Sequence, residues 1–252
     1  MILAIVQARM NSSRLPGKVL KTILGKPLIG FCLERLRYCK HIDTIAIGTT
    51  TDANDIPLVE TIERLGYQAL RGHPTDVLDR FYKISQKYNA SGIVRVTADC
   101  PLIDPAIVDN VIKMYKNSSF EYVSNIRPPS FPDGLDVEVF SPKILKQTWL
   151  SAQLPSEREH VTPYMIKILR EKIGNVTHTS DLSQLRWTVD YPEDFELVKL
   201  VIEHLYPQKC DFQMNDVLKY IEQMPKIYSD INKKFKRNEG YIKSTLDDHA
   251  KR

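Results

Sequence analysis

The first eighteen residues, 1–18, read MILAIVQARMNSSRLPGK, and the rest of the chain is organised around them. Residues 1–6 form a short apolar run whose length and composition predict a buried β-strand. Residues 7–18 are polar and contain Arg9, Arg14 and Lys18. Ligands of open α/β sheets bind beyond the carboxyl ends of the strands, so this loop is well placed to hold an anion.

The side chains of this loop suit a polyanion such as a nucleoside triphosphate. Arginine offers a fork of donors, lysine offers a point charge, and the hydroxyls of Ser12 and Ser13 supply further contacts. The loop contains neither G-x-G-x-x-G nor G-x4-G-K-[ST], so a dinucleotide site or a Walker loop is not predicted. From the residues alone, a solvated surface loop is an equal alternative to phosphate binding.

Composition limits the classes of function. The chain has 252 residues with a net charge of +4, which is too small to indicate nucleic acid as a partner. No apolar stretch approaches the roughly 20 residues of a membrane span, and we expect no signal peptide. The four cysteines show no C-x-x-C spacing, which predicts reduced thiols and a cytoplasmic location.

Alternating strand and helix patterns predict a three-layer α/β/α fold of Rossmann-like type with a mostly parallel sheet. We expect a single domain over residues 1–225 and a C-terminal arm or tail over residues 226–252. After the first strand, strands are expected at 42–48, 68–71, 93–97, 120–124, 134–140 and 185–189, and helices at 28–39, 55–65, 74–88, 104–115, 141–151, from 155, from 191 and at 215–223.

Two acidic residues follow later apolar runs. Asp99 ends the run in IVRVTADCPLIDP (residues 93–105), where a carboxylate at the same sheet edge as the basic loop is placed to bind Mg²⁺. The alternative is that Asp99 only starts a turn before proline. Asp190 ends the predicted strand in LRWTVDYPEDFELVKLV (residues 185–201), and Glu193 and Asp194 are expected as charges in the first turn of the next helix.

Other polar residues have both structural and functional interpretations. Asp79 and Arg80 lie at a helix start and can be capping or surface groups. Asp136 and Glu138 alternate with apolar residues on a predicted strand, as solvated carboxylates do. His160 follows Ser156 and Glu159, whose spacing predicts a capping box, and a lone histidine is often a core or capping residue.

Three blocks resemble the cytidylyltransferases that make CMP-activated sugar acids, with the branch named after spore-coat polysaccharide biosynthesis protein F as the nearest match. The opening loop is similar to A-R-x-x-S-x-R-x-P-x-K, the middle block to G-D-x-P-L-x-x-P and the last block to V-D-x-P-E-D. Thr97 and Ala98 depart from the glutamine and glycine of several relatives. The matching positions are Arg9, Ser12, Arg14, Pro16 and Lys18, then Asp99, Pro101, Leu102 and Pro105, then Asp190.

This resemblance implies a nucleotide-diphospho-sugar transferase fold and Mg²⁺-dependent transfer of CMP from CTP with loss of pyrophosphate. It implies a homodimer, a small sugar-like acceptor, and an acceptor-binding or dimerisation excursion near residues 126–180. The implied CTP-binding residues are Ala8, Arg9, Ser12, Ser13, Arg14, Lys18, Asp79, Arg80 and Thr97; the catalytic residues are Arg9, Arg14, Lys18 and Asp99; the metal ligands are Asp99 and Asp190; and the acceptor-binding residues are Asp136, Glu138, Arg158, Glu159 and His160.

Two other functions stay open from the sequence. A glycosyltransferase that consumes a nucleotide sugar shares this fold type, but such enzymes commonly carry a D-x-D pair, whereas Asp99 is followed here by Cys100 and Pro101. A non-catalytic nucleotide-binding partner is the second alternative. The sequence does not distinguish a sugar acid, a phosphorylated sugar or a polyol phosphate as the acceptor.

Overall fold

Strand β1 (Ile2–Gln7) lies inside a seven-stranded sheet and pairs in parallel with β4 (Thr44–Thr50) and β6 (Gly92–Thr97). The structure is a computed structural model that describes residues 1–224, 228 and 234–250. The strand order is β5–β4–β1–β6–β8–β7–β9, where β5 is Ala69–Gly72, β7 Tyr122–Ser124, β8 Glu138–Phe140 and β9 Gly174–Asn175. Among the described strands of this sheet, the pairs of β8 with β6 and β7 are antiparallel and the other pairs are parallel, which confirms the mostly parallel sheet.

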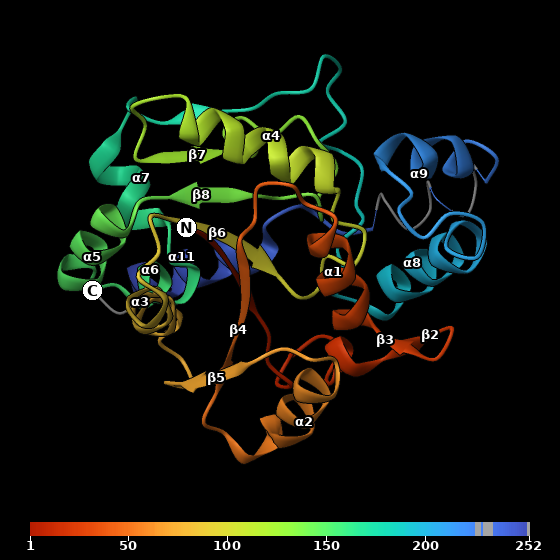
Figure 1. Ribbon diagram of the computed structural model, residues 1–252, viewed down its shortest axis with the longest axis horizontal. Coiled ribbons are helices and arrows are strands. Elements are labelled where there is room, and N and C mark those ends of the chain that lie inside the picture. The colour runs from red at the N-terminus through yellow and green to blue at the C-terminus, as the bar shows by residue number, and fades with distance from the viewer. Residues whose placement is uncertain (225–227, 229–233, 251–252) are drawn as a thin grey trace.

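The alternation of side chains along β1 separates two layers of helices. Ala4 and Val6 pack on one face, beneath α1 (Leu28–Arg37), α2 (Ile56–Arg64) and α4 (Pro105–Lys116). Leu3 and Ile5 pack on the other face, and all four side chains are fully buried. The second layer contains α3 (Val77–Tyr88), α5 (Pro142–Ser151), α6 (Pro155–His160) and α7 (Pro163–Leu169), so helices cover both faces of the sheet (Figure 1).

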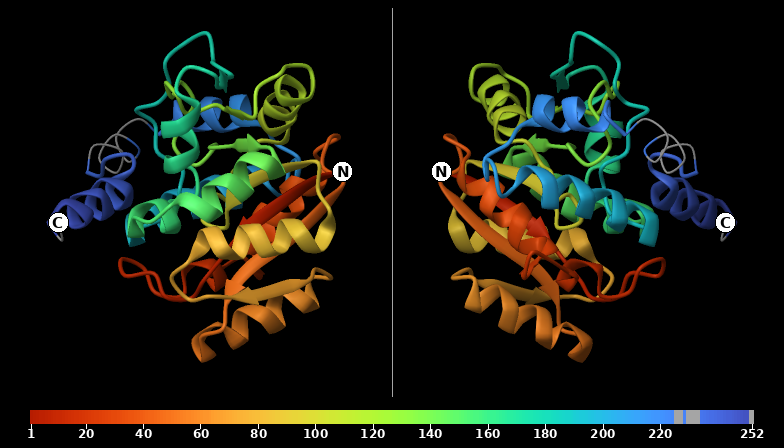
Figure 2. Two further views of the ribbon diagram at one scale, coloured as in Figure 1. Left: turned by 90° about the vertical axis from the view of Figure 1, so that its left-hand side faces the viewer. Right: turned by 90° about the vertical axis from the view of Figure 1, so that its right-hand side faces the viewer.

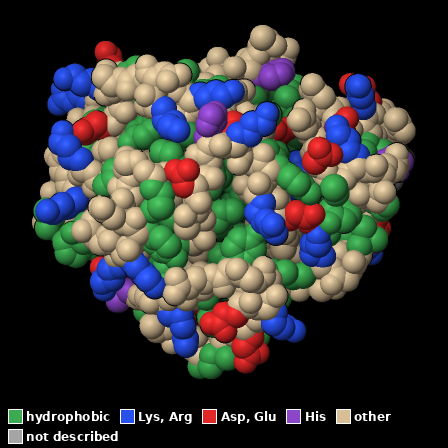
Figure 3. All heavy atoms as spheres, in the orientation of Figure 1, with side chains coloured by type: hydrophobic (Ala, Val, Ile, Leu, Met, Phe, Trp, Pro, Cys, Tyr) green, Lys and Arg blue, Asp and Glu red, His purple; other side chains and the backbone are tan. Residues whose placement is uncertain are grey.

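A third cluster of buried side chains lies beside α1, where α8 (Pro192–Leu205) and α9 (Met214–Ile221) pack around Trp187 and Phe31. A two-stranded hairpin, β2 (Thr22–Ile23) with β3 (Lys26–Pro27), and two 3-10 turns, η1 (Lys18–Leu20) and η2 (Ala53–Asp55), complete this part of the chain. On the face drawn in Figure 3, basic and acidic side chains are interspersed with hydrophobic ones.

The predicted tail contains a further helix, α11 (Glu239–Ala250). Residues 225–227, 229–233 and 251–252 of the chain lie outside the described residues. In both views of Figure 2, α11 and the N-terminus lie on opposite sides of the molecule. Strand β1 runs from the side of the N-terminus towards the side of α11. Within the described residues, no helix is both long enough and apolar enough to cross a membrane.

Three local predictions were wrong. Residues 185–189 form no strand, because their backbone groups bond to loop residues: Trp187 N donates to Asp133 O at 2.6 Å and Val189 N donates to Asp99 O at 2.9 Å. Ser156 is not an N-cap, since α6 begins at Pro155, and the carboxylate of Glu157 accepts the Leu154 N–H at 3.3 Å. The predicted strand over 134–140 is limited to β8.

The predicted excursion over residues 126–180 is partly integrated in the main sheet. This range supplies β8 and β9 to the sheet and α5 to α7 to its second helical layer. Its expected role in acceptor binding or dimerisation stays a prediction.

Candidate active site

A cavity of about 390 Å³ lies beyond the carboxyl ends of β1 and β6. The chain continues from β1 to β4 on one side and reaches β6 on the other, so this is the switch point of the sheet, where α/β proteins place their ligands. The loop after β1, the end of β6, α6 and α11 line the cavity.

The loop after β1 is held by hydrogen bonds that its backbone N–H groups donate. Ala8 N–H donates to Gly48 O at 3.0 Å, and Met10 N–H donates to Asp55 Oδ1 at 2.7 Å. Gly17 adopts a left-handed conformation with φ of 68°, which allows its N–H to return to Met10 O at 2.9 Å. The chain then enters η1, whose first residue is Lys18.

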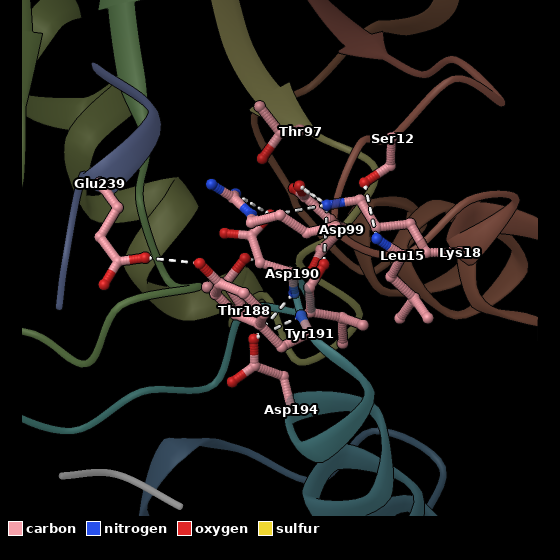
Figure 4. Close-up of polar contacts among 12 residues, drawn as sticks. Ser12, Leu15, Lys18, Thr97, Asp99, Thr188, Asp190, Tyr191, Asp194 and Glu239 are labelled. Atoms are coloured by element: carbon pink, nitrogen blue, oxygen red, sulfur yellow. Dashed lines mark hydrogen bonds and ion pairs between the residues drawn. The ribbon is translucent and has the colours of Figure 1, made fainter. Parts of the chain in front are cut away.

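Lys18 is the centre of the polar cluster (Figure 4). Its ammonium group donates to Asp99 Oδ2 at 2.6 Å, Val189 O at 2.7 Å and Asp190 Oδ1 at 2.9 Å, which uses all three of its donors. Burial opposes the charge on Lys18, but Asp99 and Asp190 outweigh it and raise the pKa of the ammonium. Lys18 therefore stays charged and joins two carboxylates that are distant in the sequence.

Asp190 is surrounded by cations. In addition to Lys18, Arg14 Nη2 lies 2.6 Å from Asp190 Oδ1, and Arg186 Nη2 lies 3.1 Å from Oδ2. Burial alone would raise the pKa of this carboxyl, but the charges of Lys18 and Arg14 hold the pKa well below its usual range. Asp190 is thus ionised whenever the protein is folded near neutral pH.

Arg186 supports Asp190 from behind the cavity. Its guanidinium contacts Asp133 at 3.0 Å and Asp194 at 2.9 Å, and only 5% of its side chain is exposed. Asp194 also accepts the backbone N–H of Asp190 at 2.9 Å. Asp194 therefore fixes the turn that carries Asp190, whereas the sequence predicted it only as a charge in the first turn of the helix.

The structure gathers most of the predicted nucleotide and metal residues around this cavity. Arg9, whose guanidinium lies 3.5 Å from the carboxylate of Glu159, is at the side nearest α6. The predicted residues that line the cavity are Ala8, Arg9, Ser12, Ser13, Arg14, Lys18, Thr97, Asp99, Glu159, His160 and Asp190.

Asp79 and Arg80 are not brought into the cavity. Asp79 accepts a hydrogen bond from Trp149 Nε1 at 3.0 Å and pairs with Lys83 at 2.8 Å, so it joins α3 to α5. Arg80 donates to the backbone oxygens of His73 and Pro74 and fixes the turn before α3. The resemblance placed both residues near the nucleotide, whereas these contacts are structural.

Three of the predicted acceptor residues are also engaged elsewhere. Glu138 accepts hydrogen bonds from Arg95 and from Tyr122, each at 2.6 Å. Asp136 pairs with Arg237 of the C-terminal segment. The third residue, Arg158, binds Asp76 Oδ2 at 2.6 Å and so joins α6 to the start of α3, outside the cavity lining.

Sequence reasoning missed several residues of the lining. Arg95 interrupts the apolar run of β6, and a cation within a buried strand was a usable signal. Gln7 at the end of β1 gave a weaker one. Lys243 and Ser244 on α11 had no recognisable signal, because no pattern in the tail predicted that it returns to the site.

The residues present fit a magnesium ion in their chemistry. Among the residues that the structure describes, no group of three or more His, Cys, Asp or Glu side chains is arranged to hold a metal. Mg²⁺ commonly uses only one or two carboxylates and completes its octahedron with water and substrate phosphates. Asp99 and Asp190, joined through one ammonium group and facing the cavity, provide such a pair.

Comparisons with known proteins identify relatives of this chain. The chain is 30% identical to the spore coat polysaccharide biosynthesis protein SpsF of Bacillus subtilis, over 89% of this chain and 95% of that protein. It is also 30% identical to 3-deoxy-manno-octulosonate cytidylyltransferase 2 of Hydrogenovibrio crunogenus, over 56% of this chain and 57% of that enzyme.

A solved cytidylyltransferase from Leptospira borgpetersenii superposes with a TM-score of 0.84 at 32% identity, covering 90% of this chain and 96% of that one. The family model described as cytidylyltransferase matches residues 3–236. This chain therefore belongs to the cytidylyltransferase family.

Proposed function

We propose that the protein transfers CMP from CTP to a small sugar acid or phosphorylated sugar-like acceptor and releases pyrophosphate. The observation that supports this most directly is the cluster of Lys18, Asp99 and Asp190 at the floor of the switch-point cavity. Two relatives add support, since one is named for polysaccharide biosynthesis and the other for a cytidylyltransferase that acts on a sugar acid. The proposed product would serve the synthesis of a cell-surface polysaccharide.

In the proposed reaction an acceptor oxygen attacks the α-phosphorus of CTP. The bond from that phosphorus to the α,β-bridging oxygen breaks, and pyrophosphate leaves with the electron pair. A hydroxyl acceptor releases its proton to water. Arg9 and Arg14 would bind the triphosphate, and Lys18, whose donors are already engaged, would attract it through its charge. Catalysis would then consist mainly of positioning and charge neutralisation.

Asp99 and Asp190 would hold Mg²⁺, which would polarise the α-phosphate. Both carboxylates line the cavity, and one ammonium group bridges them, which supports this assignment.

Pyrophosphate release from each of the four nucleoside triphosphates, with Mg²⁺ and a panel of sugar acids and sugar phosphates, tests the proposal. Release with CTP and one acceptor, abolished by EDTA and restored by excess Mg²⁺, is the expected result. Formation of a nucleoside diphosphate from a nucleotide sugar would instead identify a glycosyltransferase. Binding of CTP without any turnover across the panel would favour a non-catalytic partner.

We also propose a homodimer in the cytoplasm, as the family resemblance and the thiol chemistry suggest. Light scattering at several protein concentrations would measure the oligomeric state, and cell fractionation would test the location. A monomer at all concentrations would contradict the first expectation without affecting the proposed reaction.

A further inference from the structure

The C-terminal strap, which we define as residues 234–248, forms one wall of the cavity. Its residues Gly240, Lys243, Ser244 and Asp247 line the cavity together with α6 and the loop after β1. The family match ends at residue 236, so nearly all of the strap lies outside the part of the chain that the family shares.

Specific contacts attach the start of the strap to the site. Phe235 stacks on Tyr191 with ring centroids 3.7 Å apart. Tyr191 OH donates to Glu239 Oε2 at 2.8 Å, and Figure 4 shows this contact beside the Asp99 and Asp190 cluster. Arg237 Nη1 donates to Phe131 O at 2.9 Å. The strap therefore has a defined position next to the turn that carries Asp190.

The helical part of the strap is attached to α6. His160 Nε2 lies 2.8 Å from Ser244 Oγ, and the ring of Tyr241 packs edge-on against the His160 ring at 5.2 Å. These contacts fix the rotation of α11 at the residue next to Lys243. Lys243 consequently reaches the cavity from a helix whose register is set by His160.

The charges of the cavity distinguish Lys243 from the other cations. Within the described residues, Lys243 forms no ion pair, so an incoming anion can bind it without breaking one. Each of the others already faces a carboxylate: Arg9 faces Glu159, Arg14 faces Asp190, Lys18 faces Asp99 and Asp190, and Arg95 faces Glu138.

We propose that Lys243 binds the anionic group of the acceptor, a carboxylate or a phosphate, and that the strap thereby determines acceptor specificity. This inference rests on the proposed function and assigns the part of the cavity beside Lys243 to the acceptor. Ser244 is a positioning residue, because it orients α11 through His160. The strap is separate from the loop after β1 that would bind CTP, so the same reaction can serve different acceptors.

Steady-state kinetics of the full-length protein test this assignment. The acceptor from the panel that supports pyrophosphate release is varied at saturating CTP, and CTP is varied at saturating acceptor. For Lys243→Met we expect the KM of the acceptor to rise about tenfold or more, as loss of a charge-assisted contact requires, with kcat and the KM of CTP within about twofold of wild type. Lys243→Arg should restore most of the acceptor affinity.

Lys219→Met, which removes an exposed lysine of α9 outside the cavity, is the matched control and should leave both KM values unchanged.

An acceptor KM that changes less than twofold in Lys243→Met would overturn the inference, as would an equal rise in both KM values. An uncharged acceptor as the preferred substrate would also overturn it, while the proposed nucleotidyl transfer would stand. Absence of pyrophosphate release from wild type with every acceptor would instead count against the proposed function, and the inference would fall with it. A sugar acid or a sugar phosphate as the active acceptor would identify the anionic group.

Discussion

Lys18 Nζ lies 2.6 Å from Asp99 Oδ2, although 81 residues separate them in the sequence. The same ammonium also bonds to Asp190 Oδ1 and to the backbone oxygen before it. One buried side chain thus connects the first loop, the end of β6 and the segment before α8. Substitution of Lys18 removes all three of these contacts, whereas substitution of Asp99 affects one of them, so the two substitutions should have different effects on stability.

Asp99→Asn keeps the shape of the side chain and removes its charge. We expect pyrophosphate release to fall at least 100-fold, because the proposed metal loses a carboxylate ligand. The fold should remain, since Lys18 keeps its contacts with Asp190 and Val189, and the free energy of unfolding should fall by about 2 kcal/mol at most. Urea denaturation and the pyrophosphate assay measure the two quantities.

Asp211→Asn, at an exposed position outside the cavity lining, is the control for this substitution and should behave as wild type. An Asp99→Asn enzyme with wild-type turnover would contradict the assignment of Asp99 to the metal site.

Lys18→Met should affect stability as well as activity. It leaves Asp99 and Asp190 partly buried without the ammonium between them, and breaking such a pair on one side costs about 3–5 kcal/mol. We expect that loss in urea denaturation, together with loss of the shift in melting temperature that CTP produces in wild type.

Lys21→Met is the matched control, three residues further along the chain and exposed. The ammonium of Lys21 only contacts the Phe195 ring, at 5.1 Å, so its loss should cost no more than about 1 kcal/mol. Equal stability losses in the two variants would show that the buried cluster has no special weight.

Arg186→Met tests the residue behind the site. Arg186 contacts Asp133, Asp190 and Asp194. Burial lowers the pKa of its guanidinium, but the three carboxylates raise it by more, so the pKa is raised overall. Its removal leaves three carboxylates without this partner and should lower the free energy of unfolding by about 3–5 kcal/mol.

Arg64→Met offers a comparison at an exposed arginine whose hydrogen bonds are local, and it should change stability by less than about 0.5 kcal/mol. Activity of Arg186→Met, measured at a temperature where circular dichroism shows it folded, should also fall because Asp190 loses its support. Wild-type stability in Arg186→Met would refute the view that this network holds the site together.

The sequence predicts the parts of the site that follow regular apolar runs. The apolar run of β1 places the basic loop, and the run before Asp99 places a carboxylate at the same edge. Parallel strands bring their carboxyl ends to one edge, so these two predictions reinforce each other. Both rest on a short apolar run and the polar residues that follow it, which a single sequence contains.

Other features depend on contacts that periodicity does not encode. Residues 185–189 alternate like a strand, but their hydrogen bonds go to Asp133 and Asp99 in separate loops. Arg186 and Asp194 look like ordinary surface charges until the chain folds around them. The position of Lys243 depends on the contacts of Tyr191 and His160 with a tail that has no distinctive pattern.

His160 gives the stability a dependence on pH. Burial lowers the pKa of its imidazole below 6.5, the charge of Arg95 lowers it further, and the carboxylates of Glu159 and Glu138 oppose the effect only in part. Below pH 6.5 the unfolded chain therefore binds a proton that the folded chain resists. Stability from this group is complete above pH 6.5 and is lost as the pH falls from 6.5 towards the lowered pKa.

His160→Gln removes this titration, and the amide retains the ability to hydrogen-bond Ser244. Urea denaturation at pH 7.5 and pH 5.5 should show wild type losing more stability than the variant, by up to about 1.4 kcal/mol for each pH unit below 6.5. Above pH 7 the free energy of unfolding of the two proteins should depend on pH in the same way, because the imidazole is then neutral in the folded and the unfolded chain. Identical pH slopes for the two proteins would mean that His160 is as easily protonated in the folded chain as in the unfolded one, and α11 would then not bury it.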